Sequence, residues 1–199
     1  MKNQNRKTRG DAVFAVTYSR YPAAMVRGEG CRLWDADGKE YLDFLAGIAV
    51  CSLGHCHPAV TEAVCTQARK LMHVSNLFYT EPQTELAELL IANSFADRVF
   101  MANSGAEANE AAIKLARIHS GEGRYEIISL SGSFHGRTLA TIAATGQPKF
   151  QQGFEPMPAG FVHADFGDPD ELEKMITPQT CAILCEPLQG ESGVRPLEP

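Results

Sequence analysis

The sequence predicts an α/β fold built on a mainly parallel β-sheet with helices over both faces. Two apolar segments, RYEIISL (124–130) and CAILCEP (181–187), have the composition of buried strands. Helix-like segments lie between them, TLATIAATG (138–146) and DPDELEKMI (168–176). Strands that alternate with helices are typical of parallel sheets, because each parallel connection must cross a face of the sheet.

A further strand is expected at DRVFMAN (97–103), directly before an Ala-rich helix that begins at Gly105. The three- and four-residue spacing of one helical face predicts that the sheet-facing residues of this helix are Ala108, Ala111, Ala112 and Leu115. The Pro- and Gly-rich stretch 147–161 predicts an irregular connection.

The N-terminal part has a different pattern. The segments RLWD (32–35) and EYLDF (40–44) flank the turn signal Asp37-Gly38, so they predict a β-hairpin. Helices are expected at 58–72 and 82–92. Their inward-facing residues are expected to be Val60, Ala63, Val64, Ala68, Leu71 and Met72 on the first helix, and Leu86, Leu89 and Leu90 on the second.

The composition narrows the class of protein. The chain has 199 residues, 44% of them apolar, and a net charge of -6, which disfavours nucleic acid as a partner. No apolar run is long enough to span a membrane, and no signal-peptide pattern follows the basic start. The six cysteines form no CxxC pair, and several lie in apolar runs, which predicts buried thiols in a reducing cytoplasm. The segment His55-Cys56-His57 predicts a turn and no metal site, because adjacent residues rarely direct ligands at one ion.

The junction at 101–107 is a candidate anion-binding turn. Ser104 and Glu107 have the spacing of a capping box, in which each side chain bonds the backbone N–H of the other residue. The N–H groups of Gly105 and Ala106 would then be free at the start of the helix, where the helix dipole favours a phosphate. A capped turn that holds no ligand is the alternative, because capping boxes are common.

Two further turns follow predicted strands. Phe134 and Arg137 come after the strand at 124–130, and Glu186 and Glu191 lie at and beyond the end of the strand at 181–187. Open α/β sheets bind ligands beyond the carboxyl ends of their strands. An aromatic face, an arginine fork and helix N–H groups suit a phosphorylated aromatic cofactor and a carboxylate substrate. In the alternative interpretation Phe134 is a core residue and Arg137 is solvated. Glu186 then only orients its loop, and Glu191 is an exposed carboxylate without a role.

Three segments carry a family resemblance: NSGAEANEAAIKLAR, SFHGRTLATIAATGQPKF and CEPLQGESGV. With RGEGCRLWDADGKEYLDFLAGIAVCSLGHCHP and SNLFYTEPQ, they closely resemble the class III (ornithine/acetylornithine) aminotransferases, which are fold-type I enzymes that use pyridoxal 5'-phosphate (PLP). The resemblance covers nearly the whole chain from about Tyr18. It implies that residues 1–75 form an N-terminal segment of the small domain. Residues 76–199 would form the first, incomplete part of the large PLP-binding domain.

The resemblance also implies roles for individual residues. Gly105 and Ala106 would donate backbone N–H bonds to the PLP phosphate. Phe134 would stack on the pyridine ring, and Arg137 would bind the α-carboxylate of the substrate. Glu191 would pair with a later arginine and switch the site between the amino donor and 2-oxoglutarate.

Tyr18 and Tyr79 match tyrosines that lie near the substrate in this family. The implied activity of the whole protein is amino-group transfer from N2-acetylornithine to 2-oxoglutarate in arginine synthesis, by a cytoplasmic homodimer. An ornithine, succinylornithine or 4-aminobutyrate aminotransferase is an alternative within the family.

Two residues of the family pattern have no match in this sequence. An aspartate holds the pyridine nitrogen in these enzymes and a lysine forms the Schiff base, and both are expected beyond Pro199. The chain is therefore expected to be a fragment without catalytic residues of its own, inactive when alone. A non-catalytic truncated product is the alternative from a different functional class.

Overall fold

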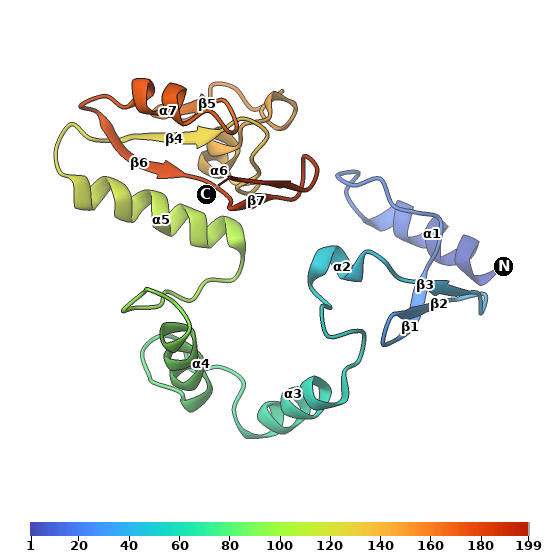
Figure 1. Cartoon of the computed structure of the whole chain (residues 1–199). Coiled ribbons are helices and arrows are strands. Elements are labelled where there is room, and N and C mark those ends of the chain that lie inside the picture. Colours follow the sequence, from blue (N-terminus) through green and yellow to red (C-terminus); the bar gives the residue numbers. More distant parts are fainter. Residues whose placement is uncertain (199) are drawn as a thin grey trace. The chain divides into compact units, whose positions relative to one another are not determined.

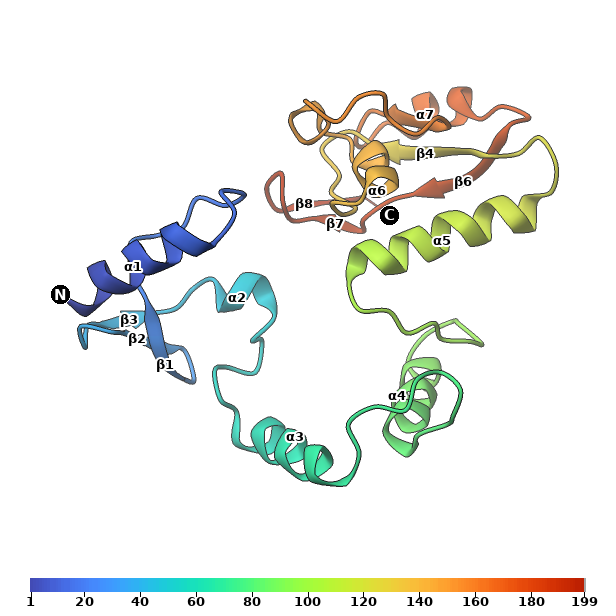
Figure 2. The same ribbon diagram turned by 180° about the vertical axis from the view of Figure 1, so that it is seen from behind.

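The computed structural model describes residues 1–198, and the chain divides into two compact units, Met1–Glu81 and Pro82–Pro199. Figure 1 labels most of their helices and strands, and Figure 2 also labels β8. No helix in the described part of the chain is both long enough and apolar enough to cross a membrane.

The first unit is built around a three-stranded antiparallel sheet. Its elements are α1 (Lys2–Val13), β1 (Met25–Glu29), β2 (Arg32–Asp35), β3 (Glu40–Leu42), α2 (Ala46–Ala49) and α3 (Pro58–Lys70). β2 pairs with β3 in the register Leu33 to Tyr41, so the predicted hairpin is confirmed.

Asp35, at the end of β2, is the polar centre of this unit. Its buried carboxylate accepts hydrogen bonds from the Tyr41 hydroxyl at 2.8 Å, the Asn3 amide at 2.9 Å and two backbone N–H groups of the turn. Burial alone would raise the pKa of Asp35, but these hydrogen bonds outweigh it and lower the pKa to about 2. Asp35 therefore joins α1, through Asn3, to the hairpin.

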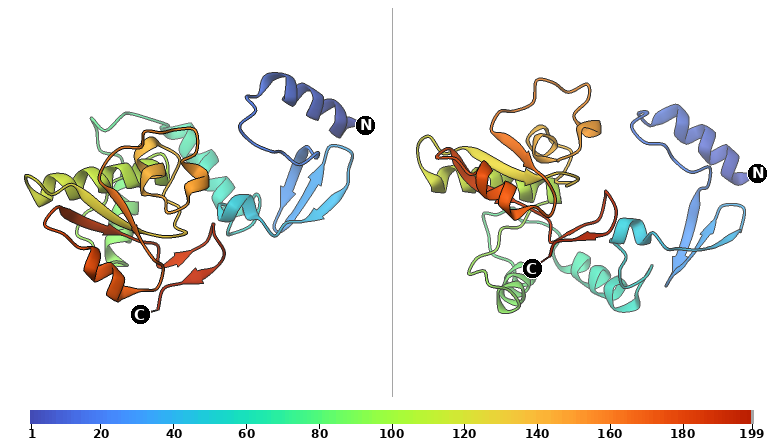
Figure 3. Two further views of the ribbon diagram at one scale, coloured as in Figure 1. Left: turned by 90° about the horizontal axis from the view of Figure 1, so that it is seen from above. Right: turned by 45° about the horizontal axis from the view of Figure 1, so that its top comes forward.

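The second unit carries a parallel sheet in the strand order β5–β4–β6. Its elements are α4 (Glu81–Ala92), which begins at the boundary, α5 (Gly105–Ser120), β4 (Glu126–Leu130), α6 (Leu139–Ala144), the 3-10 turn η1 (Pro148–Phe150), β5 (Phe161–Ala164), α7 (Pro169–Met175), β6 (Thr180–Leu184), β7 (Leu188–Gln189) and β8 (Arg195–Pro196). The last two strands form a small antiparallel hairpin that follows β6 (Figure 3).

The central strand β4 is buried on both faces, as helices on both sides of a sheet require. On one face Ser129 donates a hydrogen bond to the Ala144 carbonyl of α6 at 2.6 Å. On the other face Ile128 and Leu130 are buried together with Ala164, and Leu172 and Met175 of α7 pack against them. α5 runs alongside β6, as both Figures 1 and 2 show. The predicted parallel α/β arrangement is confirmed.

One strand prediction is wrong, and one strand was not predicted. Residues 97–103 form no strand, because no described strand pairs with them, and Phe100 is exposed. The stretch 147–160 is irregular apart from the 3-10 turn η1, as predicted, but the strand β5, which begins at Phe161 and pairs with Ile127 of β4, was not predicted. Only the neighbouring strand reveals β5, since its four residues FVHA carry little pattern of their own.

The apolar faces predicted to be buried on three helices are mainly exposed, so these predictions are also wrong. On α5 the buried residue is Ile113, with 4% of its surface exposed, whereas Leu115 is 66% exposed. On α3 and α4 the apolar side chains are exposed, because no element in the described residues covers them: Val60, Val64, Leu71 and Met72 at the first helix, and Leu86, Leu89 and Leu90 at the second.

The cysteines do not follow the prediction of buried thiols. Cys31, Cys56, Cys65 and Cys185 are exposed, and Cys51 and Cys181 are partly buried. An apolar sequence neighbourhood did not predict burial here, since Cys31, Cys51, Cys56 and Cys185 lie outside the helices and strands, and Cys65 lies on the exposed helix α3.

Candidate functional site

The first turn of α5 presents free backbone donors. The Ser104 hydroxyl accepts a hydrogen bond from the Glu107 N–H at 3.2 Å, as the capping box predicts. The Glu107 carboxylate, however, accepts from the Asn103 N–H at 2.7 Å and not from Ser104. In the part of the chain that the structure describes, the N–H groups of Gly105 and Ala106 form no hydrogen bond. These two donors and the helix dipole make the turn suitable for an anion.

The loop that follows β4 lies directly against this turn. Gly136 has a φ of +138°, and a Cβ atom there would come within 2.8 Å of the Ala106 Cβ. Asn109 of α5 donates a hydrogen bond to the His135 carbonyl at 2.7 Å. The Thr138 hydroxyl also donates to the Glu110 carboxylate of α5. The structure therefore brings together the start of α5 and the loop 131–138, two candidate regions that are separate in the sequence.

Side chains from later elements hold the backbone of the same loop. Each bond satisfies a different backbone group, so the loop conformation is fixed almost residue by residue. The bonds run from Gln189 Nε2 to the Ser131 carbonyl at 3.1 Å, from Gln147 Nε2 to the Ser133 carbonyl at 3.0 Å, from the Phe134 N–H to Glu186 Oε2 at 2.9 Å, and from the His135 N–H to Thr145 Oγ1 at 3.0 Å.

Phe134 and Arg137 occupy the part of this loop that can meet a ligand. Phe134 is half-buried, and its ring contacts Phe150 edge to face, with 5.4 Å between the ring centroids. Arg137 is exposed, and its Cζ lies 5.9 Å from the Phe134 ring centroid and 5.2 Å from that of Phe150. An aromatic face and a free guanidinium thus lie beside each other at the carboxyl end of β4.

Glu191, in the turn between β7 and β8, belongs to the same neighbourhood. Its carboxylate accepts a hydrogen bond from Gln147 Nε2 at 2.7 Å and pairs with Lys149 Nζ at 3.2 Å. The Gln147 hydrogen bond, supported by the charges of Lys149 and Arg137, lowers the pKa of Glu191. Glu191 is therefore an ionised group held close to the guanidinium of Arg137.

His135 lies beneath the loop with only 4% of its surface exposed. Its Nε2 has no hydrogen-bond partner in the described residues. Burial, together with the nearby His163, lowers the pKa of His135 to about 4. The ring is neutral near pH 7 and points no charge at the candidate site.

Tyr18 and Tyr79 belong to the first unit, whereas the other five predicted site residues belong to the second. Tyr18 is exposed, and its ring centroid lies 5.7 Å from the Arg20 guanidinium. Tyr79 is fully exposed at 100%. Their predicted place near the substrate stays a prediction.

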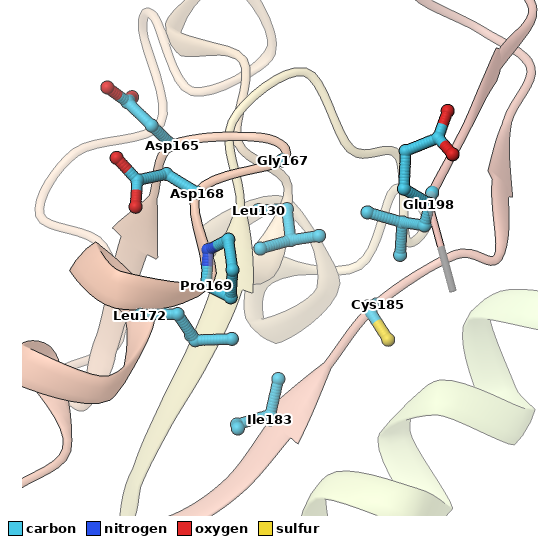
Figure 4. Close-up of a pocket in the computed structure, with 10 residues that line it drawn as sticks. Leu130, Asp165, Gly167, Asp168, Pro169, Leu172, Ile183, Cys185 and Glu198 are labelled. Atoms are coloured by element: carbon cyan, nitrogen blue, oxygen red, sulfur yellow. The ribbon is translucent and has the colours of Figure 1, made fainter.

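A separate pocket lies beside α7 (Figure 4) and contains none of the predicted site residues. Leu130, Leu172 and Ile183 give it an apolar floor. Asp165, Asp168 and Glu198 also line it, so its charge disfavours a phosphate or a carboxylate. The anion donors at α5 and the guanidinium of Arg137 are the better match to an anionic ligand.

The described residues contain no group of three histidine, cysteine, aspartate or glutamate side chains placed to hold a metal ion. In the segment His55-Cys56-His57, His55 Nε2 instead lies 2.6 Å from a carboxylate oxygen of Asp43. This contact ties the segment to the end of the hairpin.

Sequence reasoning missed the residues that hold the loop. Gln147, Gln189, Thr145 and Asn109 carry no motif of their own, and their role depends on which carbonyl or N–H the fold places beside them. Glu186 is predicted either to belong to the ligand-binding cluster or to orient its own loop, and in the structure it bonds the backbone of the loop after β4. Its position directly after a strand was the only available signal.

Comparison with known proteins gives one family. The model of the family Aminotransferase class-III matches residues 13–199. The acetylornithine aminotransferase of Thermosynechococcus vestitus is 55% identical over an alignment of 196 residues, and the match covers 94% of this chain and 48% of that protein. The acetylornithine aminotransferase of Myxococcus xanthus is 54% identical over an alignment of 182 residues, and the match covers 89% of this chain and 45% of that protein.

Solved structures give the same fold. The ornithine aminotransferase from Toxoplasma gondii matches with a TM-score of 0.92 and 31% identity, over 99% of this chain and 48% of that one. The N-acetylornithine aminotransferase from Stenotrophomonas maltophilia matches with a TM-score of 0.75 and 38% identity, over 96% of this chain and 47% of that one. The chain thus spans about half the length of the relatives it matches.

Proposed function

The chain belongs to the class-III aminotransferases, and from that premise we propose that the protein carrying it transfers the amino group of N2-acetylornithine to 2-oxoglutarate. Class-III aminotransferases are PLP-dependent enzymes of fold type I. The name shared by relatives at 54–55% identity supports acetylornithine as the amino donor. A place in arginine synthesis, a cytoplasmic location and a homodimer are part of the same proposal.

One observation carries this proposal: two unbonded backbone N–H groups, an aromatic face and a guanidinium lie around one fixed loop. The free N–H groups of Gly105 and Ala106 suit the cofactor phosphate. Phe134 supplies a flat apolar surface for the pyridine ring. Arg137 supplies a planar fork for a carboxylate. The residues present therefore fit PLP and an amino-acid substrate.

When bound, PLP supplies the electron sink that makes a proton on the amino-bearing carbon labile. The chain's own residues hold and orient the cofactor and the substrate. Gly105 and Ala106 would hold the PLP phosphate through their N–H groups. Phe134 would lie against the pyridine ring, and Arg137 would bind the substrate carboxylate. Glu191, kept ionised by Gln147 and Lys149, places a negative charge near Arg137. The lysine and aspartate that complete the chemistry are proposed to lie outside residues 1–199.

A second candidate is amino transfer from ornithine, favoured by the fold match to the Toxoplasma gondii ornithine aminotransferase. Succinylornithine and 4-aminobutyrate are further donors that the site geometry does not distinguish, because Arg137 recognises a carboxylate common to all of them. A non-catalytic product is the candidate outside the enzymes. It would bind PLP weakly, through the α5 turn alone.

The test uses the protein as its source makes it, here called the natural-length protein. Initial rates with 2-oxoglutarate are measured for acetylornithine, ornithine, succinylornithine and 4-aminobutyrate. A kcat/KM highest for acetylornithine supports the proposal, and a higher value for another donor replaces it with that donor. No transamination with any of the four overturns the enzyme proposal in favour of the non-catalytic product.

Arg137 is tested in the same assay. Arg137→Ala should raise the KM for acetylornithine and for 2-oxoglutarate by roughly tenfold or more, because a charged hydrogen-bonding partner of both carboxylates is lost. Arg137→Lys should give KM values between those of the unmodified protein and Arg137→Ala, since lysine keeps the positive charge but cannot form the two parallel hydrogen bonds of a guanidinium. Lys174→Ala, an exposed cation on α7, is the charge control. Unchanged KM values for both substrates in Arg137→Ala would remove Arg137 from the site.

A further inference from the structure

Glu186 makes a contact to which the proposed function assigns no role. It lies two residues beyond the end of β6, where its carboxylate accepts the Phe134 N–H at 2.9 Å. Both residues are partly buried. Phe134 is the residue proposed to meet the cofactor ring, so the contact reaches the site through the backbone of its aromatic residue.

The strand order of the sheet brings Glu186 and Phe134 together. β4 and β6 are adjacent and parallel, with Ser129 opposite Leu184. Their carboxyl ends therefore share one edge, and residues a short distance beyond each end can bond. Glu186 is followed by Pro187, whose ring restricts the backbone of the preceding residue to extended conformations. The position of the Glu186 carboxylate is thus limited by its own backbone.

The Phe134 bond differs in kind from its neighbours. The Ser131 and Ser133 carbonyls accept from the neutral amides of Gln189 and Gln147, and the His135 N–H bonds the Thr145 hydroxyl. Only the Phe134 N–H, among these loop groups, bonds a carboxylate. Hydrogen bonds to an ionised acceptor are roughly twice as strong as neutral ones.

The backbone bond matters because the contacts of the Phe134 ring do not by themselves fix where the ring lies. The ring packs edge to face against Phe150 at an interplanar angle of 71°, and the Arg137 guanidinium lies 5.9 Å from its centroid. Such packing allows a ring to shift, since aromatic pairs tolerate centroid distances of about 4.5–7 Å. The direction of the Cα–Cβ bond, which the backbone sets, therefore limits where the face of the ring can lie.

We propose that Glu186 is a positioning residue, whose carboxylate fixes the Phe134 backbone so that the phenyl ring presents its face to the ring of PLP. This inference rests on the proposed function. It assigns Glu186 no contact with the cofactor or the substrate. Its effect must therefore pass through Phe134, and a test can separate this path from a general loss of stability.

The test measures the dissociation constant of PLP by equilibrium dialysis against the apo form of the natural-length protein. Glu186→Leu should raise this constant about tenfold, because the partly buried Phe134 N–H loses a charged partner. Glu186→Gln should raise it less than about threefold, since its amide oxygen still accepts the bond. Glu173→Leu removes an exposed carboxylate from α7 and should leave the constant unchanged.

The pathway is tested in a Phe134→Ala background. There Glu186→Leu should raise the constant by less than about twofold further, because the ring it positions is gone. A full tenfold effect that persists in this background would overturn the proposal. So would an unchanged constant for Glu186→Leu in the Phe134 protein.

Failure of the proposed function gives a different result. If the unmodified protein binds no PLP, the cofactor proposal falls, and the orientation of Phe134 toward PLP falls with it. Hydrogen exchange of the Phe134 amide then decides whether Glu186 holds this residue at all. Faster exchange in Glu186→Leu, with protection kept in Glu186→Gln, supports the backbone contact, and unchanged exchange in both variants refutes it.

Discussion

Single residues decide how closely the loop after β4 can approach the first turn of α5. Gly136 is the clearest case, because its φ of +138° is one that side chains rarely adopt. A Cβ atom there would also lie 2.7 Å from Thr141 Oγ1 and 2.8 Å from the Ala106 Cβ. The close approach that builds the site therefore requires glycine at this position.

Gly136→Ala should destabilise the natural-length protein by roughly 1–3 kcal/mol, the cost of a strained backbone and a forced shift of neighbours. The measurement is the midpoint of urea unfolding. Gly190→Ala is the matched control, since a Cβ atom there meets nothing within 4 Å and its φ is unstrained. Equal midpoints for the two variants would contradict the close contact between Gly136 and Ala106.

His135 ties the stability of the same loop to pH. The pKa of its ring is about 4 in the folded protein, below the ordinary value of 6.5, because of its burial and the nearby His163. Between these values the unfolded chain binds a proton that the folded chain does not. Folding stability should therefore fall as pH falls from 6.5 to 4.

His135→Phe should remove this contribution while keeping a ring in the buried space. Urea unfolding of the natural-length protein at pH 7 and pH 4 gives the comparison. The unmodified protein should lose more unfolding free energy between these pH values than His135→Phe does. His163 and the carboxylates titrate in both proteins, so parallel losses would show that His135 does not contribute.

At the scale of elements, α5 shows how far a periodic pattern can predict packing. Its start at Gly105, its cap at Ser104 and its end before Gly121 were all predictable, because capping depends on neighbouring residues alone. The buried face was not predictable. The helix has apolar residues on two sides, and the sheet covers the side that carries Ile113. The side that carries Leu115 and Ile118 is exposed.

This difference gives a matched pair of changes on one helix, tested in the natural-length protein. Ile113→Ser should lower the helical circular-dichroism signal, because it places a hydroxyl against the sheet. Leu115→Ser should keep that signal, because the sheet does not cover this side of the helix. If Leu115→Ser lost as much helix as Ile113→Ser, the assignment of the two faces would be wrong.

At the scale of the whole molecule, many apolar side chains are exposed and few are buried. The apolar side chains of α3, α4 and one side of α5 are uncovered in the described residues, and the buried apolar core is confined mainly to β4 and its neighbours. A domain with so small a core gains little stability from burial. The relatives are about twice as long, so their further residues are available to cover comparable surfaces.

The 199-residue chain by itself is therefore expected to fold poorly. It should bind ANS and show no sharp thermal transition, because few apolar groups change exposure on heating. Scanning calorimetry after size-exclusion chromatography tests this. A cooperative transition in a monomeric sample would contradict the prediction.

The sequence by itself determined the features that depend on local chemistry and on composition: the hairpin around Asp37-Gly38, the cap at Ser104, the alternation of strands and helices, and the family. It also singled out Phe134, Arg137 and Glu191 as candidates, whose roles stay proposals. Tertiary structure alone decided which side of α5 is buried, that 161–164 forms a strand, and that Glu186, Gln147 and Gln189 hold the loop after β4. The physical reason is that strand pairing and side-chain bonds to distant backbone groups depend on which segments the fold places together, and no local pattern records that.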